Sequence, residues 1–176
     1  MKQLVLKQNL EFEKKLNIET EVVEIIEVQT NNFRSAVQKS KGLVIIKGGN
    51  EKINRLAVEN KQVDILLSPE DNNRKDSFFI KKSGINQVMC RLAKSNGVSI
   101  GINFSDLLNS NGKERTIRLG RIIQNVKICK KFGVNMVIGT FANNKYELRS
   151  NDCLKSFAKV IGMNNSDVKK LFIVEN

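Results

Sequence analysis

The stretch VSIGINFS (residues 98–105) leads through the amphipathic segment ERTIRLGRIIQNVKICKKF (114–132) to a second apolar run, VNMVIGTF (134–141). Both apolar runs are rich in Val and Ile and almost free of charge in their centres, which is typical of strands covered on both faces. Between them, one face of the predicted helix collects the apolar residues at helical spacing, which are Leu119, Ile122, Ile123, Val126, Cys129 and Phe132. The order strand, helix, strand predicts a parallel βαβ unit with a right-handed crossover.

The same alternation extends in both directions along the chain. We predict strands over 21–28, 43–49, 63–69, 98–105 and 134–141, and helices over 32–41, 51–60, 85–95, 114–132 and 151–162. MKQLVLK (1–7) is a candidate further strand, and a charged helix over 165–172 follows the last unit. Five strand–helix units predict an α/β fold with a parallel sheet. Periodicity alone leaves open whether the sheet is a TIM-barrel-like barrel or a doubly wound open sheet.

Length and composition place further limits on the protein. The 176 residues, 40% of them hydrophobic, predict one domain over 1–176 with a substantial core. No apolar run approaches the ~20 residues of a membrane span, and MKQLVLKQNLEFEKK has no apolar signal-peptide core. Three cysteines without a CxxC pair, namely Cys90, Cys129 and Cys153, predict buried thiols in a reducing cytoplasm.

The chain contains no histidine. This excludes imidazole as a general base, as a zinc ligand and as the partner of a Ser or Cys nucleophile. Carboxylate chemistry stays possible in principle, but we expect no paired or clustered acids at the strand ends. The sequence therefore favours a binding surface over a hydrolytic centre.

The net charge of +12 is unevenly distributed. Residues 1–72 hold 11 Lys or Arg and 11 Asp or Glu, whereas residues 73–176 hold 19 Lys or Arg and 7 Asp or Glu. The whole excess therefore lies in the second part, which indicates a polyanionic partner. Nucleic acid is the first candidate and an anionic membrane surface the second; a basic but merely solvated surface is the simplest alternative.

Ligands of parallel α/β folds meet the carboxyl ends of the strands. One strand end leads into the loop NNRKDSFFIKK (72–82), which offers Arg74, Lys75, Lys81 and Lys82 to phosphates, with Asp76 in a position to orient Arg74. The apolar residues Phe78, Phe79 and Ile80 are unusual in a solvated loop. They fit packing on the rim or contact with a protein partner better than stacking on bases.

Two further groups of cations lie near strand ends. Arg115, Arg118 and Arg121 recur every three residues near the start of helix 114–132, where they oppose the helix dipole. Arginine is also suited to bidentate phosphate contacts, so this pattern favours an edge facing RNA or DNA. After the last strand, NNKYELRS (143–150) brings Lys145 and Arg149 to the same face. Its Tyr146 is interpreted as a rim-packing residue, with base stacking as the alternative.

The turn KGGNEK (47–52) joins a strand to a helix, and its backbone N–H groups could cradle a phosphate. It lacks the full dinucleotide or P-loop pattern. We therefore interpret it as a plain strand–helix turn, with the phosphate cradle as the alternative.

From VDILLSP (63–69) onward, the chain resembles ribonuclease P protein component 3, a family of TIM-barrel-like subunits of archaeal and eukaryotic ribonuclease P. The resemblance is carried by VDILLSP followed by NRKD (73–76), by SGINQVMCRLAKSNGVSIGINFSDLL (83–108), by ER (114–115) with RLGRIIQNVKICKKFGVNMVIGTFA (118–142), and by YELRSNDCLKSFAKVIGM (146–163). It covers roughly residues 43–163. The family usually has about one more strand–helix unit at the N-terminus, so the resemblance implies a barrel that is either incomplete or closed unusually. SFFIKK (77–82) has the form of an insertion.

The resemblance implies a role in removing the 5′ leader from precursor tRNA. It implies that catalysis resides in the RNA subunit with its Mg²⁺ ions, and that this chain has no cofactor and no catalytic residue of its own. Implied partners are ribonuclease P RNA, precursor tRNA, a small RRM-like protein subunit and other ribonuclease P proteins, in the cytoplasm of an archaeon. The expected RNA-binding residues are Asn73, Arg74, Lys75, Lys81, Lys82, Arg115, Arg118, Arg121, Lys145 and Arg149, and the expected partner-binding residues are Phe78 and Phe79.

Two other functions compete with this one. A small barrel enzyme or binding protein for a phosphorylated metabolite would use KGGN (47–50) and the basic rim. A peripheral membrane protein is the weakest alternative, because no basic amphipathic helix exposes a broad apolar face.

Overall fold

The computed structural model describes residues 2–78 and 81–170, with the backbone alone for the last two of them. The strands are β1 (Lys2–Val5), β2 (Glu19–Val22), β3 (Ile25–Ile26), β4 (Ile45–Lys47), β5 (Ile65–Leu67), β6 (Ser99–Asn103) and β7 (Met136–Gly139). The helices are α1 (Leu10–Leu16), α2 (Phe33–Lys39), α3 (Glu51–Glu59), α4 (Gln87–Asn96), α5 (Phe104–Asn109), α6 (Gly112–Phe132), α7 (Asn151–Val160) and α8 (Asn165–Lys170).

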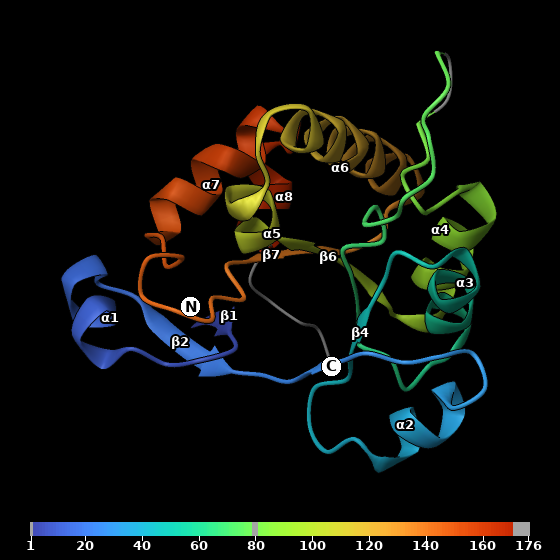
Figure 1. The fold of residues 1–176 in the computed structure, drawn as a ribbon, viewed down its shortest axis with the longest axis horizontal. Coiled ribbons are helices and arrows are strands. Elements are labelled where there is room, and N and C mark those ends of the chain that lie inside the picture. The colour runs from blue at the N-terminus through green and yellow to red at the C-terminus, as the bar shows by residue number, and fades with distance from the viewer. Residues whose placement is uncertain (1, 79–80, 171–176) are drawn as a thin grey trace.

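The strands form two parallel sheets that curve into a TIM-barrel-like ring with helices outside it (Figure 1). One sheet pairs β1 with β2, and the other has the order β3-β4-β5-β6-β7. Only residues 23 and 24 separate β2 from β3, so one stretch of chain passes from one sheet to the other. The predicted parallel α/β fold and the candidate strand at the N-terminus are confirmed.

The ring is brought together by backbone contacts rather than by a regular ladder between β7 and β1. Phe141 N donates to Leu4 O at 2.9 Å, and the backbone nitrogens of Leu6 and Lys7 each donate to Ala142 O at 3.0 Å. These bonds join the residues after β7 to β1. The two ends of the barrel are therefore joined through residues at the ends of β1 and β7. The sequence had left open whether the barrel is incomplete or unusually closed.

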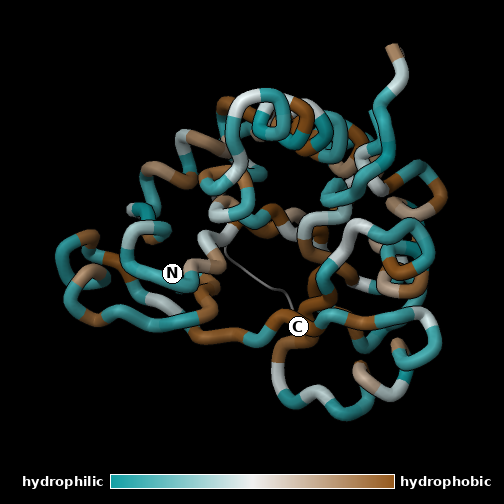
Figure 2. The backbone as a smooth tube through the Cα atoms, viewed as in Figure 1, coloured by the Kyte–Doolittle hydropathy of each residue, from teal (hydrophilic) through white to brown (hydrophobic). Residues whose placement is uncertain are grey.

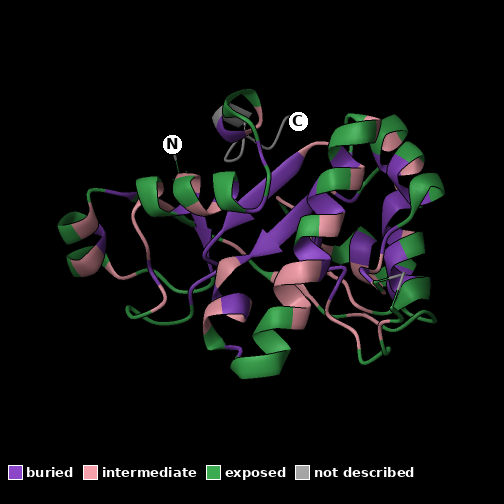
Figure 3. Cartoon of the chain, turned by 90° about the horizontal axis from the view of Figure 1, so that it is seen from above, coloured by how far each residue is buried: buried purple, intermediate pink, exposed green. Residues whose placement is uncertain are grey.

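The core has an outer and an inner layer, because successive side chains of a strand point to opposite faces. Ile46, Leu66 and Ile100 face the helices, whereas Ile45 and Ile65 lie in a separate cluster. That inner cluster fills the ring with Leu4, Ile45, Ile65, Leu67, Val137 and Phe141. Hydrophobic segments follow strands β4 to β7 in Figure 2, and Figure 3 shows the buried strands of the central sheet beneath helices whose outer faces are exposed.

Asparagine side chains start several of the helices that follow strands. Asn50 Oδ1 accepts from Lys52 N at 2.9 Å, Asn86 Oδ1 accepts from Met89 N at 3.0 Å, and Asn103 Oδ1 accepts from Ser105 N at 3.0 Å. Each bond satisfies an amide that has no partner inside its helix. These caps fix where α3, α4 and α5 begin.

Some details differ from the sequence-based expectations. Helix α1 was not predicted, and residues 104–109 form α5 where a strand end was expected. Ile123 was expected on the core face of α6 but is 42% exposed, and Cys153 is exposed rather than buried. The predicted strand over 21–28 is divided into β2 and β3.

Buried Asn54 of α3 connects the residues after β5 to the start of the α4 region. Its Nδ2 donates to Pro69 O and to Gly84 O, each at 3.0 Å. Gly84 has φ +87°, and a Cβ at this position would lie 1.8 Å from Pro69 O. Only glycine allows this approach, which brings the two ends of residues 69–84 together.

We predict that Gly84→Ala destabilises the protein more than Gly97→Ala. Both positions have positive φ, but a Cβ at Gly97 meets nothing within 4 Å. Gly97→Ala should therefore cost about 1 kcal/mol of left-handed backbone strain, and Gly84→Ala about 1–3 kcal/mol more from the collision with Pro69. Urea unfolding measures both; equal midpoints for the two variants would contradict the close approach.

Candidate nucleic-acid interface at the strand ends

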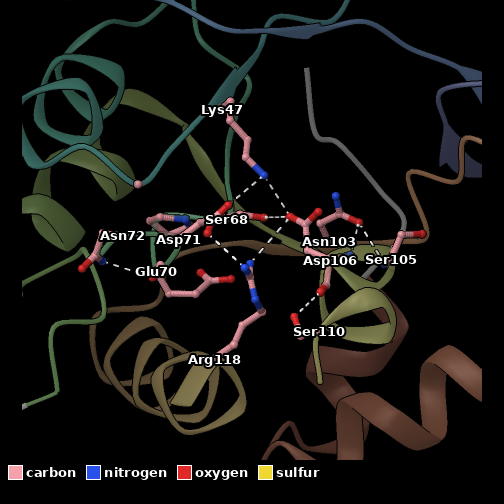
Figure 4. A network of polar contacts seen from close by, with 12 residues as sticks. Lys47, Ser68, Glu70, Asp71, Asn72, Asn103, Ser105, Asp106, Ser110 and Arg118 are labelled. Carbon is pink, nitrogen blue, oxygen red and sulfur yellow. Dashed lines mark hydrogen bonds and ion pairs between the residues drawn. The ribbon is translucent and has the colours of Figure 1, made fainter. Parts of the chain in front are cut away.

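Four charged side chains meet over the carboxyl ends of the strands and form a closed ring of ion pairs (Figure 4). Lys47 Nζ lies 2.9 Å from Asp106 Oδ2 and 3.3 Å from Asp71 Oδ2. On the other side, Arg118 Nη2 lies 3.0 Å from Asp71 Oδ1, and Arg118 Nη1 lies 3.9 Å from Asp106 Oδ2. The ring ties β4, the residues after β5, α5 and α6 to one another.

Ser68 adds a hydroxyl to this ring. It follows β5, has the positive φ of +50°, and donates from Oγ to Asp106 Oδ2 at 3.0 Å. A left-handed conformation is uncommon for a residue other than glycine and is found where the surroundings fix it. Here the buried hydroxyl is held against the Asp106 carboxylate.

Three charges of the ring, those of Lys47, Asp71 and Arg118, are favoured by their neighbours against the effect of burial. Burial opposes the charged form of Lys47, but Asp106 and Asp71 outweigh it and raise the pKa of the ammonium. Burial likewise opposes ionisation of Asp71, and the charges of Arg118 and Lys47 lower the pKa of its carboxyl group nevertheless. The two cations and the two carboxylates of the ring balance one another in formal charge.

This ring corrects the expectation that no acids gather at the strand ends. Asp71 and Asp106 come from segments that are 35 residues apart in the sequence, and the two neighbouring cations neutralise them. Within residues 2–78 and 81–170, no group of three or more His, Cys, Asp or Glu residues could hold a metal ion. The strand-end rule could have identified both aspartates, since each follows a strand within a few residues.

Glu70 lies beneath the ring and is 3% exposed. Its Oε2 accepts a hydrogen bond from Asn125 Nδ2 at 3.5 Å. Burial raises the pKa of Glu70 to about 7, although its own backbone N–H and the charge of Arg118 act in the opposite direction. Sequence patterns did not indicate that Glu70 is buried, because its burial depends on the packing of loop 69–76 against α6.

Arg121 holds that loop in place. Its guanidinium is 6% exposed and pairs with Asp76 at 2.9 Å. It also donates to the carbonyl oxygens of three alternate loop residues: Glu70 O at 3.0 Å, Asn72 O at 2.8 Å and Arg74 O. One buried side chain thus satisfies the carbonyl groups of a loop that forms no regular structure of its own.

The three arginines of α6 do not share one face. A spacing of three residues is 300° of rotation in a helix with 3.6 residues per turn, so each step shifts the side chain by 60°. Arg115 is exposed and donates to Ser110 O at 2.8 Å, the side chain of Arg118 is 13% exposed, and Arg121 is buried. The expectation of a single arginine edge is therefore corrected, with Arg115 nearest to solvent.

The cations of loop 72–82 have different environments. Asn73, Arg74, Lys75 and Lys81 are exposed, and Lys82 is partly exposed. Arg74 pairs with Glu51 of α3 instead of Asp76, which corrects the expectation that Asp76 orients it. Lys81 lies against α6, where a Cβ at Gly120 would be 3.0 Å from its Nζ.

The loop projects as an arm beyond α4 and α6, at the upper right of Figure 1. Its base is closed by Asn72, whose Nδ2 donates to Lys82 O at 2.8 Å, and by Asp76, whose Oδ1 accepts from Lys82 N at 2.7 Å. Phe78 is 96% exposed, which excludes rim packing for this ring. Phe79 and Ile80 lie outside the described residues.

The last predicted group of cations, in residues 143–150, lies on the other side of the ring of strands from the arm (Figure 1). Lys145 is exposed, and Arg149 is partly exposed and donates to Tyr146 O and Leu148 O, both at 2.7 Å. Tyr146 is 71% exposed, so its interpretation as a rim-packing residue is wrong.

The Gly-Gly turn after β4 has already used its amides. Gly48 N donates to Leu67 O at 2.7 Å, and Gly49 N donates to Asn54 Oδ1 at 2.9 Å. In the first turn of α3, the amides of Lys52 and Ile53 donate to the Asn50 side chain. The two glycine amides that a phosphate cradle at KGGN would use are therefore occupied, which favours the plain turn over that alternative.

Comparison with known proteins identifies the family. Residues 9–174 match the sequence profile described as RNase P subunit p30. The chain belongs to the RNase P subunit p30 family.

Two curated members of the p30 family illustrate the relationship. Ribonuclease P protein component 3 of Methanocaldococcus jannaschii is 39% identical over 146 residues, which are 83% of this chain and 58% of that protein. The protein of the same name from Methanosarcina mazei is 35% identical over 148 residues, which are 82% of this chain and 59% of that protein. The matched region thus spans somewhat less than two thirds of these p30 relatives.

A solved structure agrees with the p30 assignment. A chain in a cryo-EM structure described as archaeal ribonuclease P with mature tRNA superposes with a TM-score of 0.73 at 31% identity. The match covers 97% of this chain and 75% of the other. In the part of the chain that the structure describes, no helix is both long and apolar enough to cross a membrane.

We predict that Arg121→Ala destabilises this p30 chain by about 3 kcal/mol, because it removes the ion pair with Asp76 and the hydrogen bonds to three loop carbonyls. Lys127→Ala is the matched control, since Lys127 is an exposed cation on the same helix. Its free energy of unfolding should change by no more than about 0.5 kcal/mol. Urea unfolding measures the free energy of unfolding of both variants. If Arg121→Ala behaves like the control, Arg121 does not hold loop 69–76 in place.

We further predict a pH-dependent effect of Glu70→Gln. The pKa of Glu70 rises from 4.5 to about 7 on folding, so the folded state holds a proton that the unfolded state has lost between these values. This contribution reduces wild-type stability as pH rises from 4.5 to 7, by about 3 kcal/mol in total. Glutamine cannot ionise, so the Glu70→Gln variant does not lose this free energy of unfolding as pH rises.

The measurement compares the variant with the wild type by urea unfolding at pH 5 and pH 8. The difference in free energy of unfolding should shift in favour of Glu70→Gln at pH 8. Asp71 and Asp76, whose pKa values are lowered, are present in both proteins and cancel in the comparison. A difference that stays constant with pH would show that Glu70 is ionised in the folded protein at pH 5.

Proposed function

We propose that this protein is a subunit of ribonuclease P that binds RNA through the cations at its strand-end rim. Membership of the p30 family is the observation that carries the proposal. The likeness to a chain in a structure of archaeal ribonuclease P with mature tRNA supports it. The excess of 12 positive charges after residue 72 supplies the electrostatic attraction that RNA phosphates require.

The proposed RNA surface consists of the cations that remain accessible. Those of the arm are Arg74, Lys75, Lys81 and Lys82, next to Asn73, while Arg115, Lys145 and Arg149 lie elsewhere on the rim. Arg118 and Arg121 support this surface from below. Arg118 pairs with Asp71 in the ring of ion pairs, and Arg121 pairs with Asp76 of the loop. Contacts of this kind position a protein on the RNA backbone without reading its sequence.

In this proposal the chain is a scaffold and not the catalyst. Removal of the 5′ leader of precursor tRNA is assigned to the RNA subunit and its Mg²⁺ ions, and this chain contributes no cofactor and no catalytic residue. The internally neutral ring of Lys47, Asp71, Asp106 and Arg118 fits a supporting role, because its charges are used to join elements of the protein. A small RRM-like subunit is the proposed protein partner, and the exposed Phe78 is a candidate contact for it.

The experiment measures binding of ribonuclease P RNA over a series of salt concentrations. The double variant Arg74→Ala/Lys75→Ala should bind more weakly and should lower the slope of log K against log salt concentration by about two, because each lost phosphate contact lowers it by about one. A parallel assay of precursor-tRNA cleavage, reconstituted with and without the RRM-like partner, tests the assembly.

The matched control is Lys41→Ala/Lys61→Ala. These exposed lysines precede β4 and β5, so they lie at the amino ends of the strands, opposite the proposed surface. The control removes the same charge and should leave the slope nearly unchanged. Equal effects of the two double variants would show that binding follows net charge and not this surface.

A further inference from the structure

An aromatic pair with two lysines lies on the rim away from the arm. The Tyr146 and Phe12 rings are arranged edge to face, with centroids 6.5 Å apart and an interplanar angle of 68°. Lys145 Nζ lies 5.2 Å from the Tyr146 centroid and 5.5 Å from the Phe12 centroid, and Lys15 Nζ lies 5.3 Å from the Phe12 centroid. Residues that are at least 130 positions apart in the sequence thus form one small basic and aromatic surface.

The two rings have different environments. Phe12 is partly buried beside the small core cluster that contains Val5 and Leu148, whereas Tyr146 is 71% exposed. Phe12 therefore supports the Tyr146 ring from the protein side, and Tyr146 presents its ring to solvent. An exposed apolar residue is common by itself, but here the ring is backed by a second ring and accompanied by cations.

The loop that carries Tyr146 is rigidly held. Glu147 Oε2 accepts from Asn143 N at 2.8 Å, and its Oε1 accepts from the side chains of Asn144 at 2.9 Å and Asn109 at 3.1 Å. Burial opposes ionisation of Glu147, but these hydrogen bonds outweigh it and lower its pKa. The carboxylate is thus directed into the loop and away from the outer surface.

The backbone of Tyr146 itself is fixed at both ends. Its N–H donates to Asn144 Oδ1 at 2.9 Å, and its carbonyl accepts from Arg149 Nη1 at 2.7 Å. Leu148, two residues further, is buried. A ring on such a support loses little freedom when something stacks on it, which favours binding.

We propose that Tyr146, supported by Phe12 and accompanied by Lys145, is a stacking site for an unpaired base of single-stranded RNA. Aromatic rings bind unpaired bases by stacking, and nearby cations contact the adjoining phosphates. Tyr146 supplies the ring, and Lys145, whose Nζ lies 5.2 Å from the centroid of that ring, supplies the cation. The inference rests on the proposed function, because it names the kind of RNA that one part of the rim would bind.

The site is separate from the arm. Tyr146 follows β7 and contacts α1, whereas Arg74 follows β5 and contacts α3. Figure 1 places α1 and the arm on opposite sides of the ring. Loss of one surface therefore leaves the other intact, and the two can be tested independently.

The chain has one tyrosine and no tryptophan, so its intrinsic fluorescence reports on Tyr146 alone. We would titrate the full chain with a single-stranded oligouridylate and with a duplex RNA, and correct the emission against N-acetyltyrosinamide at the same RNA absorbance. The single strand should quench Tyr146 at saturation, and the duplex should not. Anisotropy of labelled RNA gives the affinities.

Tyr146→Ala should weaken binding of the single strand about tenfold, whereas Tyr146→Phe should bind like the wild type because it keeps the ring. Both variants keep the backbone hydrogen bonds of the loop, and circular dichroism melting checks that they fold. Lys145→Ala should flatten the salt dependence of single-strand binding by about 0.7 in slope. Binding of the duplex should be nearly unchanged by Tyr146→Ala.

Wild-type affinity of Tyr146→Ala for the single strand would overturn the stacking site, as would an equal loss for single strand and duplex. Unchanged Tyr146 emission at saturating single-stranded RNA would overturn it too. The same holds if the emission changes only when another protein subunit is added. If ribonuclease P RNA binds with a steep salt slope in any of these cases, the proposed function stands without the stacking site. Failure to bind any RNA would remove the proposed function and the stacking site with it.

Discussion

The buried guanidinium of Arg121 determines the shape of the strand-end rim. Residues 70–76 have no regular structure, so their carbonyl groups need donors from elsewhere, and Arg121 provides three of these bonds together with the ion pair to Asp76. The exposed cations of the arm begin directly after the residues that this side chain holds. A surface that offers cations to a partner thus depends on one cation that is withdrawn from solvent.

The ring of Lys47, Asp71, Asp106 and Arg118 separates structural charge from surface charge. Burying one of these ions alone would be very costly, and the alternation of acids and bases removes most of that cost. Because the ring is neutral, it adds nothing to the field outside the barrel. The positive potential that would attract RNA comes from the exposed cations around it.

The rim then carries two surfaces of different chemistry. The arm offers charge on an extended loop, whereas the loop after β7 offers an aromatic ring on a rigid base with lysines beside it. Charge alone suits the uniform backbone of folded RNA, and an aromatic ring suits bases that are not paired. One scaffold could thereby contact both kinds of RNA segment within a single partner.

The sequence by itself determined the parallel α/β fold, the order of the strand–helix units and the location of the excess charge, because these depend on local periodicity and composition. It could also have located α1, whose start Asn9 caps by accepting from Phe12 N. Only the tertiary structure decided the roles of individual charges. Arg115 and Arg121 are alike in the sequence, but a rotation of 60° per step exposes one and buries the other. Long-range contacts likewise decided that Tyr146 meets Phe12.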